Sequence, residues 1–121
     1  MTTIPTSHSP PNAIARKLRA IQEKGALRGV DIANVLGTRP ETVSRWNQGK
    51  AFPRPDKEKL LVELEYIVDQ LSDFYDPREA RLWLISRQKI MDGEIPAELI
   101  QKGETEKVIR IINQLRDGVY L

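Results

Sequence analysis

Cysteine is absent from this chain of 121 residues, and histidine occurs once, at His8. Without thiols the chain has no disulfide bonds and no thiolate metal ligands, and a single histidine with no acidic neighbour is a poor metal or acid–base candidate. No apolar run approaches the roughly 18 residues that a membrane span needs. The first residues also lack the basic-then-apolar pattern of a secretion signal. We therefore expect a cytoplasmic protein that makes no membrane contact.

Sequence patterns typical of enzymes are missing too. The chain has no serine–histidine–acid set, no glycine-rich phosphate loop and no cluster of metal-ligating residues. Its paired acids, Glu63 with Glu65 and Glu104 with Glu106, are two residues apart, which places them on different faces of a helix. We therefore expect no catalytic activity and no cofactor.

Charge is plentiful and unevenly distributed. Residues 1–54 hold nine Lys or Arg against three acids, whereas residues 55–121 hold ten against fourteen. The front half is thus +6 and the back half −4, which suggests two different partners. The length fits one domain, or two small domains that share packing.

Glycine and proline divide the chain into segments with helical periodicity. Residues 1–12 contain three prolines and little apolar content, which predicts a disordered tail. Beyond them, apolar stripes such as Ile14, Leu18 and Ile21 recur at helical spacing, and no strand pattern is present. The sequence therefore predicts an all-α fold of about seven helices, over residues 12–25, 29–37, 39–48, 56–75, 77–88, 96–103 and 104–117.

Polar residues at the start of these segments predict how the helices are capped. We expect caps at Asn12, at Thr38 with Glu41 three residues later, at Asp56, and at Asp76 with Glu79. For the long helix 56–75 we expect one buried stripe, formed by Leu60, Leu64, Ile67, Leu71 and Phe74.

The polar stretch GTRPETVSRWNQGK, residues 37–50, follows a short apolar helix across a glycine turn. Two helices joined in this way can form a helix-turn-helix. Ala33 permits a close crossing, Gly37 suits the turn, and Val43 and Trp46 can hold the second helix against a core. The alternative is a pair of helices that pack in a bundle and meet no nucleic acid.

The residues VLGTRPETVSRWNQGK resemble the LG…TVSRW…G core of the helix-turn-helix in the Xre/phage-repressor class. This resemblance implies that helix 39–48 lies in the major groove of double-stranded DNA. Its base readers would be Arg39, Glu41, Ser44 and Arg45, with Arg45 suited to guanine and Glu41 to cytosine. Phosphate contacts would come from Arg28, Thr38, Gln48 and Lys50.

The segments REARLWL and MDGEIPAELIQKGETEKVIRIINQL resemble the C-terminal domain of the Xre/MbcA/ParS antitoxins. The matching positions are Ala80, Trp83, Leu84, Gly93, Pro96, Leu99, Gly103, Val108 and Ile112. The resemblance implies a type II antitoxin that dimerises, binds a cognate RES-domain toxin, which consumes NAD, and represses its own operon. It divides the chain into a tail (1–12), a DNA-binding domain (13–75) and a toxin-binding domain (76–121).

The chain ends in RDGVYL, and the resemblance implies that this end helps to cover the toxin. We expect toxin contacts from Arg116, Val119, Tyr120 and Leu121, since aromatic and aliphatic side chains carry most interface energy. The alternative is that Tyr120 and Leu121 fold back onto their own core. A second function also stays open, that of a stand-alone Xre-family transcriptional regulator whose C-terminal half only dimerises.

Overall fold

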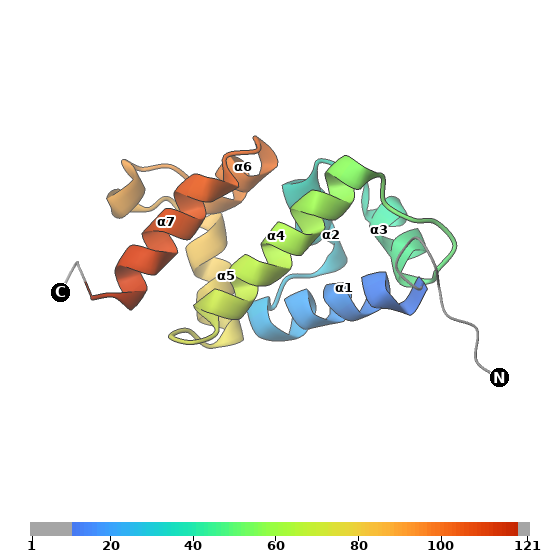
Figure 1. Cartoon of the computed structure of the whole chain (residues 1–121), viewed down its shortest axis with the longest axis horizontal. Helices are drawn as coiled ribbons and strands as arrows, with labels where there is room; N and C mark the ends of the chain where they lie inside the picture. Colours follow the sequence, from blue (N-terminus) through green and yellow to red (C-terminus); the bar gives the residue numbers. More distant parts are fainter. Residues whose placement is uncertain (1–10, 119–121) are drawn as a thin grey trace.

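The computed structural model describes residues 11–118. This part of the chain contains seven α-helices, one short 3-10 helix and an isolated antiparallel bridge between Gln88 and Glu94, and it has no strand (Figure 1). The all-α prediction is confirmed. The helices are α1 (Pro11–Gly25), α2 (Gly29–Leu36), α3 (Pro40–Asn47), α4 (Pro55–Leu71), α5 (Pro77–Ile85), η1 (Lys89–Met91), α6 (Pro96–Gln101) and α7 (Thr105–Arg116).

Helix α4 forms the axis of the molecule and packs against α1 on one side and α7 on the other. Helix α3 lies at one end of the elongated molecule and α7 at the opposite end (Figure 1). Between these ends, α5 contacts α1 and α6 contacts α2, so the C-terminal helices pack directly on the N-terminal ones. The expected division into functional regions at residue 76 stays a prediction.

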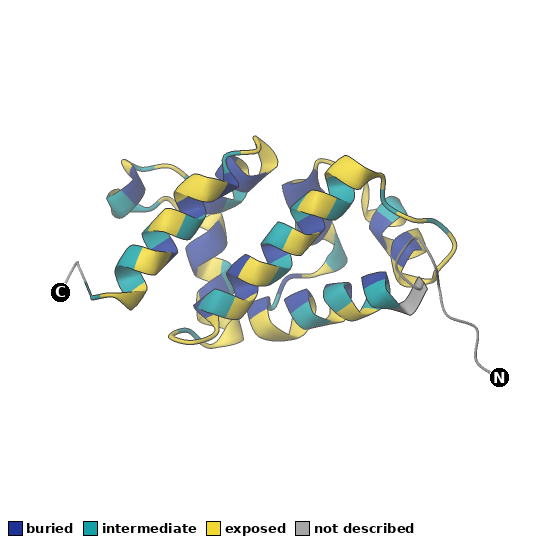
Figure 2. Ribbon diagram, viewed as in Figure 1, coloured by how far each residue is buried: buried dark blue, intermediate teal, exposed yellow. Residues whose placement is uncertain are grey.

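A single hydrophobic core runs through both halves of the chain. The buried faces of the helices point inward along the whole molecule (Figure 2). Trp46 of α3 and Trp83 of α5 belong to the same cluster, and they are 3% and 8% exposed. The two halves of the chain therefore share their packing.

Proline, and not the expected polar caps, decides where two of the helices begin. A residue before proline is restricted to extended conformations, and proline itself suits the first helical position. Pro40 therefore begins α3 with Arg39 as its N-cap, and Pro55 begins α4 with Arg54 as its N-cap. The caps predicted at Thr38 and Asp56 are wrong.

The two other predicted caps had different outcomes. Asp76 and Glu79 form a reciprocal capping box, because each side chain accepts a hydrogen bond from the other residue's backbone N–H, both at 2.9 Å. Helix α1 begins at Pro11, one residue before Asn12, so Asn12 lies inside the helix and is not its cap.

The buried face of α4 also differs from the expected stripe. Leu61 and Val68 are fully buried, whereas Leu60 is half-buried. Helix α4 ends at Leu71, and Phe74 lies in the following turn with 37% of its surface exposed. The reason is that α4 contacts both α1 and α7, so its buried face is wider than one stripe.

Helix α5 is shorter than predicted and ends at Ile85. Ser86 is extended, and the Gln88 side chain turns back so that its Nε2 donates to the carbonyl oxygen of Trp83 at 2.8 Å. This hydrogen bond satisfies a carbonyl group at the C-terminal end of α5, just before the chain enters η1.

Candidate functional site

The turn between α2 and α3 is held in a defined shape. Gly37 has φ 69°, in the left-handed region, and the Thr38 N–H donates to the carbonyl oxygen of Ala33 at 2.9 Å. Together they form a glycine-dependent helix ending. The Nζ of Lys57, a residue of α4, donates a hydrogen bond to the carbonyl oxygen of Leu36 at 2.7 Å. The start of α3 is thus fixed relative to both α2 and α4.

Helix α3 is amphipathic, with its apolar side closed against the core. Val43 and Trp46 are each 3% exposed, as the sequence predicted. Helix α3 contacts α1 and α2, which leaves its opposite face open to solvent. Four of the predicted DNA contacts from this segment are exposed: Arg39, Glu41, Ser44 and Arg45.

The other predicted DNA contacts lie around this face. Gln48 and Lys50 are exposed at the end of α3, and Thr38 is half-buried in the turn. Arg28 precedes α2, where its exposed guanidinium lies 3.7 Å from Asp31. Gln48 Nε2 donates to Ser44 Oγ at 3.5 Å.

The cationic side chains beside α3 have no partner in the described part of the chain. The side chains of Arg39, Arg45 and Lys50 make no hydrogen bond or ion pair with any residue from 11 to 118. The lysines facing α4 differ, since Lys17 pairs with Glu65 and Lys24 with Asp69. The positive charge at the α3 end is therefore available to an external anion.

A partly buried ion pair links α2 to α5, and no sequence pattern predicted it. Asp31 accepts from the Arg28 backbone N–H at 2.9 Å and from the guanidinium of Arg81 at 3.2 and 3.4 Å. Burial by itself would raise the pKa of Asp31, but the bonds from Arg28 and Arg81 outweigh it and hold that pKa below its ordinary value. The partners are 50 residues apart, so no local pattern could reveal the contact.

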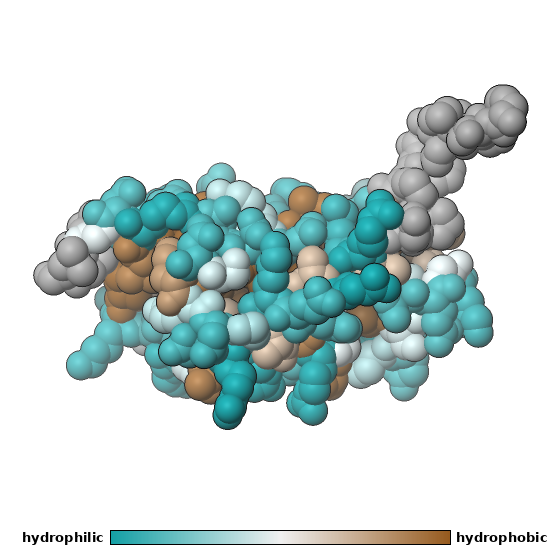
Figure 3. Space-filling view, turned by 90° about the horizontal axis from the view of Figure 1, so that it is seen from below, coloured by the Kyte–Doolittle hydropathy of each residue, from teal (hydrophilic) through white to brown (hydrophobic). Residues whose placement is uncertain are grey.

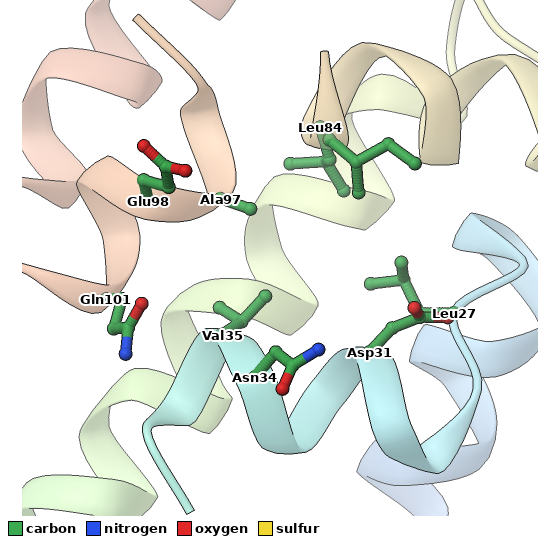
Figure 4. Close-up of a pocket in the computed structure, with 9 residues that line it drawn as sticks. Leu27, Asp31, Asn34, Val35, Leu84, Ala97, Glu98 and Gln101 are labelled. Atoms are coloured by element: carbon green, nitrogen blue, oxygen red, sulfur yellow. The ribbon is translucent and has the colours of Figure 1, made fainter.

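A cavity of about 220 Å³ lies at the same junction of α2, α5 and α6 (Figure 4). Leu27, Val35 and Leu84 supply apolar walls, while Asn34 and Glu98 line it with polar groups. Within residues 11–118, no group of three His, Cys, Asp or Glu side chains is placed to hold a metal ion. Among the helices described, none has the length and apolar character to cross a membrane.

Comparison with known proteins places the chain among antitoxins. No family model matches it. It is 32% identical over 92 residues to the probable mycobacterial cidal antitoxin Rv3188 of Mycobacterium tuberculosis, which covers 76% of this chain and 78% of that protein. The chain belongs to the mycobacterial cidal antitoxin family. A longer match, 26% identical over 110 residues, joins this antitoxin to the mycobacterial cidal antitoxin MbcA of the same organism and covers 91% and 97% of the two chains.

A solved structure supports the same assignment. The antitoxin matches the crystal structure of the M. tuberculosis MbcT-MbcA toxin-antitoxin complex with a TM-score of 0.80 and 25% identity. The match covers 91% of this chain and 99% of that chain. The antitoxin resemblance of the sequence is therefore confirmed, together with the all-α fold.

Of the residues predicted to meet a toxin, Arg116 lies within the described part of the antitoxin, at the α7 end, where Figure 3 shows apolar side chains at the surface. Arg116 is exposed, and its guanidinium bonds to Gln70 and, at 3.4 Å, to Asp73. The bond to Gln70 holds the C-terminal end of α7 against α4. Val119, Tyr120 and Leu121 lie outside the described residues, so their contacts stay a prediction.

Proposed function

We propose that this antitoxin neutralises a cognate RES-domain, NAD-consuming toxin and represses its own operon by binding operator DNA as a homodimer in the cytoplasm. The observation that carries the DNA-binding part is the exposed face of α3, where Arg39 and Arg45 have no partner within residues 11–118. Membership of the antitoxin family supports the toxin-binding part.

Two features of the α2–α3 pair support recognition of a DNA groove. A recognition helix must be rigid. Helix α3 is held against the core by the buried Trp46, and the Gly37 turn fixes its start. Guanidinium groups reach guanine in the major groove with two parallel hydrogen bonds, and a carboxylate can accept from cytosine. Glu41 and Arg45 supply such groups from the exposed face of α3, and Arg39 supplies one from the N-cap position.

The test of DNA binding is the Arg45→Ala variant. We expect it to weaken binding to the promoter region of its own operon by roughly 1–3 kcal/mol and binding to random DNA much less. The affinity of the wild-type chain should fall steeply with salt. Arg110→Ala is the matched control, since Arg110 is an exposed arginine of α7 at the other end of the molecule. Unchanged promoter binding by Arg45→Ala would remove α3 from the recognition surface.

The test of toxin binding is removal of residues 118–121 (GVYL). We expect the shortened chain to neutralise the toxin encoded by the neighbouring gene less well and to bind DNA almost unchanged. Growth after co-expression with the toxin measures the first effect, and a promoter-binding assay measures the second. Full rescue of growth removes the tail from the mechanism, while loss of both activities makes it a structural element. If the full-length chain binds the promoter and rescues no growth, the protein is a stand-alone regulator.

A further inference from the structure

The outer face of α4 carries two large apolar side chains that no residue from 11 to 118 covers. Val62 and Tyr66, one helical turn apart, are 44% and 45% exposed. Beside them, a groove of about 410 Å³ runs between α1 and α4. It is lined by Ala20, Lys24, Val62, Glu65, Tyr66 and Asp69.

The exposed residues of this face follow the spacing of a helix–helix seam. Lys59, Val62, Tyr66 and Asp69 are separated by three, four and three residues, the repeat by which two helices pack along their length. We call these four residues the α4 stripe. Its order is a cation, two apolar residues and an anion.

This order is self-complementary. Val62 and Tyr66 lie equally far from the midpoint of the stripe, and so do Lys59 and Asp69. An antiparallel copy of α4 centred on that midpoint therefore sets Val62 against Tyr66 and Lys59 against Asp69, twice over. A two-fold interface requires such a patch, because the same surface serves both subunits.

We propose that the α4 stripe is the dimer interface of this antitoxin, with α4 of a second copy lying antiparallel on it. This inference rests on the homodimer included in the proposed function. Lys59 makes no ion pair with residues 11–118 and is available to the second copy. Asp69 already pairs with Lys24 at 2.5 Å through Oδ1, which leaves Oδ2 for Lys59 of the second copy. The groove receives the ring of Tyr66 from that copy.

The remaining surface chemistry agrees with a protein occupant. On this face Lys17 and Lys24 are already paired with Glu65 and Asp69, so these lysines offer the phosphates of DNA little free positive charge. Helix α3 packs on α1 and α2, so the exposed face of α3 and the α4 stripe are separate surfaces that two partners can occupy together.

The decisive experiment uses two charge-reversal variants of the full chain, Lys59→Glu and Asp69→Lys. Each variant alone places like charges opposite one another at both ends of the seam, and we expect its dimer to dissociate roughly ten-fold more easily or more. Mixing the two variants restores both attractive pairs in the heterodimer. Analytical ultracentrifugation of each variant and of the equimolar mixture, with one variant labelled, measures the dissociation constants.

A second variant keeps the test independent of the Lys24–Asp69 pair. Val62→Glu buries a carboxylate in the centre of the proposed seam, and we expect a monomer with the melting temperature of a folded chain. Leu82→Glu is the matched control, since Leu82 is an exposed apolar residue of α5 outside the stripe (57% exposed). Its dimer should be unchanged.

Recovery of the dimer in the mixture, together with a monomeric Val62→Glu variant, supports the inference. Variants that dimerise as the wild type does, or a mixture as weak as its components, would overturn it. A wild-type chain that is monomeric yet binds its promoter would overturn the interface and leave α3 recognition standing. A Val62→Glu variant that keeps its dimer and loses only toxin neutralisation would assign this face to the toxin.

Discussion

Replacing Asp31 with alanine tests whether the contact between the two halves of the chain stabilises the whole molecule. The carboxylate accepts one backbone hydrogen bond at the start of α2 and two bonds from Arg81 of α5. Loss of this capping-box bond, which Asp31 makes from the N3 position to the N-cap backbone, costs about 1 kcal/mol. The Arg81 bonds are long and Arg81 is 30% exposed, so we assign them about 1 kcal/mol as well. The ion pair with the largely exposed Arg28 adds little.

We therefore expect Asp31→Ala to lower the free energy of unfolding by about 2 kcal/mol, which for a chain of this size lowers the melting temperature by about 6–10 °C. Urea unfolding followed by tryptophan fluorescence is the assay, because Trp46 and Trp83 report on different halves. Glu23→Ala, which removes an exposed carboxylate of α1, is the control. A melting temperature within 2 °C of the wild type would refute the assignment.

The pH dependence of this difference follows from the pKa of Asp31. Because the folded pKa lies below the ordinary value of 3.8, the carboxylate stabilises the fold fully above that pH. The contribution is lost as pH falls through the folded pKa. The stability gap between the wild type and Asp31→Ala should therefore be constant near neutral pH and close below pH about 4. A gap that widens on acidification would mean that Asp31 is not held as the anion.

Three further substitutions test the elements that position α3 and α7. Trp46→Ala should cost about 3–5 kcal/mol, because the indole is 3% exposed, and a soluble variant with unchanged thermal melting would contradict this. Gly37→Ala should cost about 1–2 kcal/mol in urea unfolding, because φ 69° strains any residue with a Cβ, although the Cβ itself would meet only ordinary contacts. Thr105→Val should cost roughly 1 kcal/mol by the same measurement, since the buried Thr105 hydroxyl donates to Glu63 at 2.8 Å and joins α7 to α4, and wild-type stability would show that this bond contributes nothing.

The sequence predicted the number and order of the helices because their boundaries are local. Gly37 and Gly103 interrupt periodic segments at positions of positive φ, and Pro77 and Pro96 begin helices. The burial of Val43 and Trp46 followed from their spacing alone. Such features depend on a few neighbouring residues, which the sequence displays directly.

The wrong caps at Thr38 and Asp56 were local errors, whereas two others concern contacts made by distant residues. The choice between Leu60 and Leu61 as the buried position of α4 depends on where α1 and α7 lie, which periodicity does not reveal. The Asp31–Arg81 pair is invisible for the same reason. For the α3 surface, the sequence identified the residues, while the structure adds that Arg39 and Arg45 have no partner within residues 11–118.

The common core also restricts how a chain of this kind can evolve. Leu27 and Val35 of the N-terminal half face Leu84 and Ala97 of the C-terminal half across one junction. A recombination that joined residues 1–75 to an unrelated C-terminal segment would cut through these contacts and expose apolar surface. The two halves must therefore be inherited as a unit. A new specificity on either side has to arise by substitutions at the surface, with the buried contacts between the halves retained.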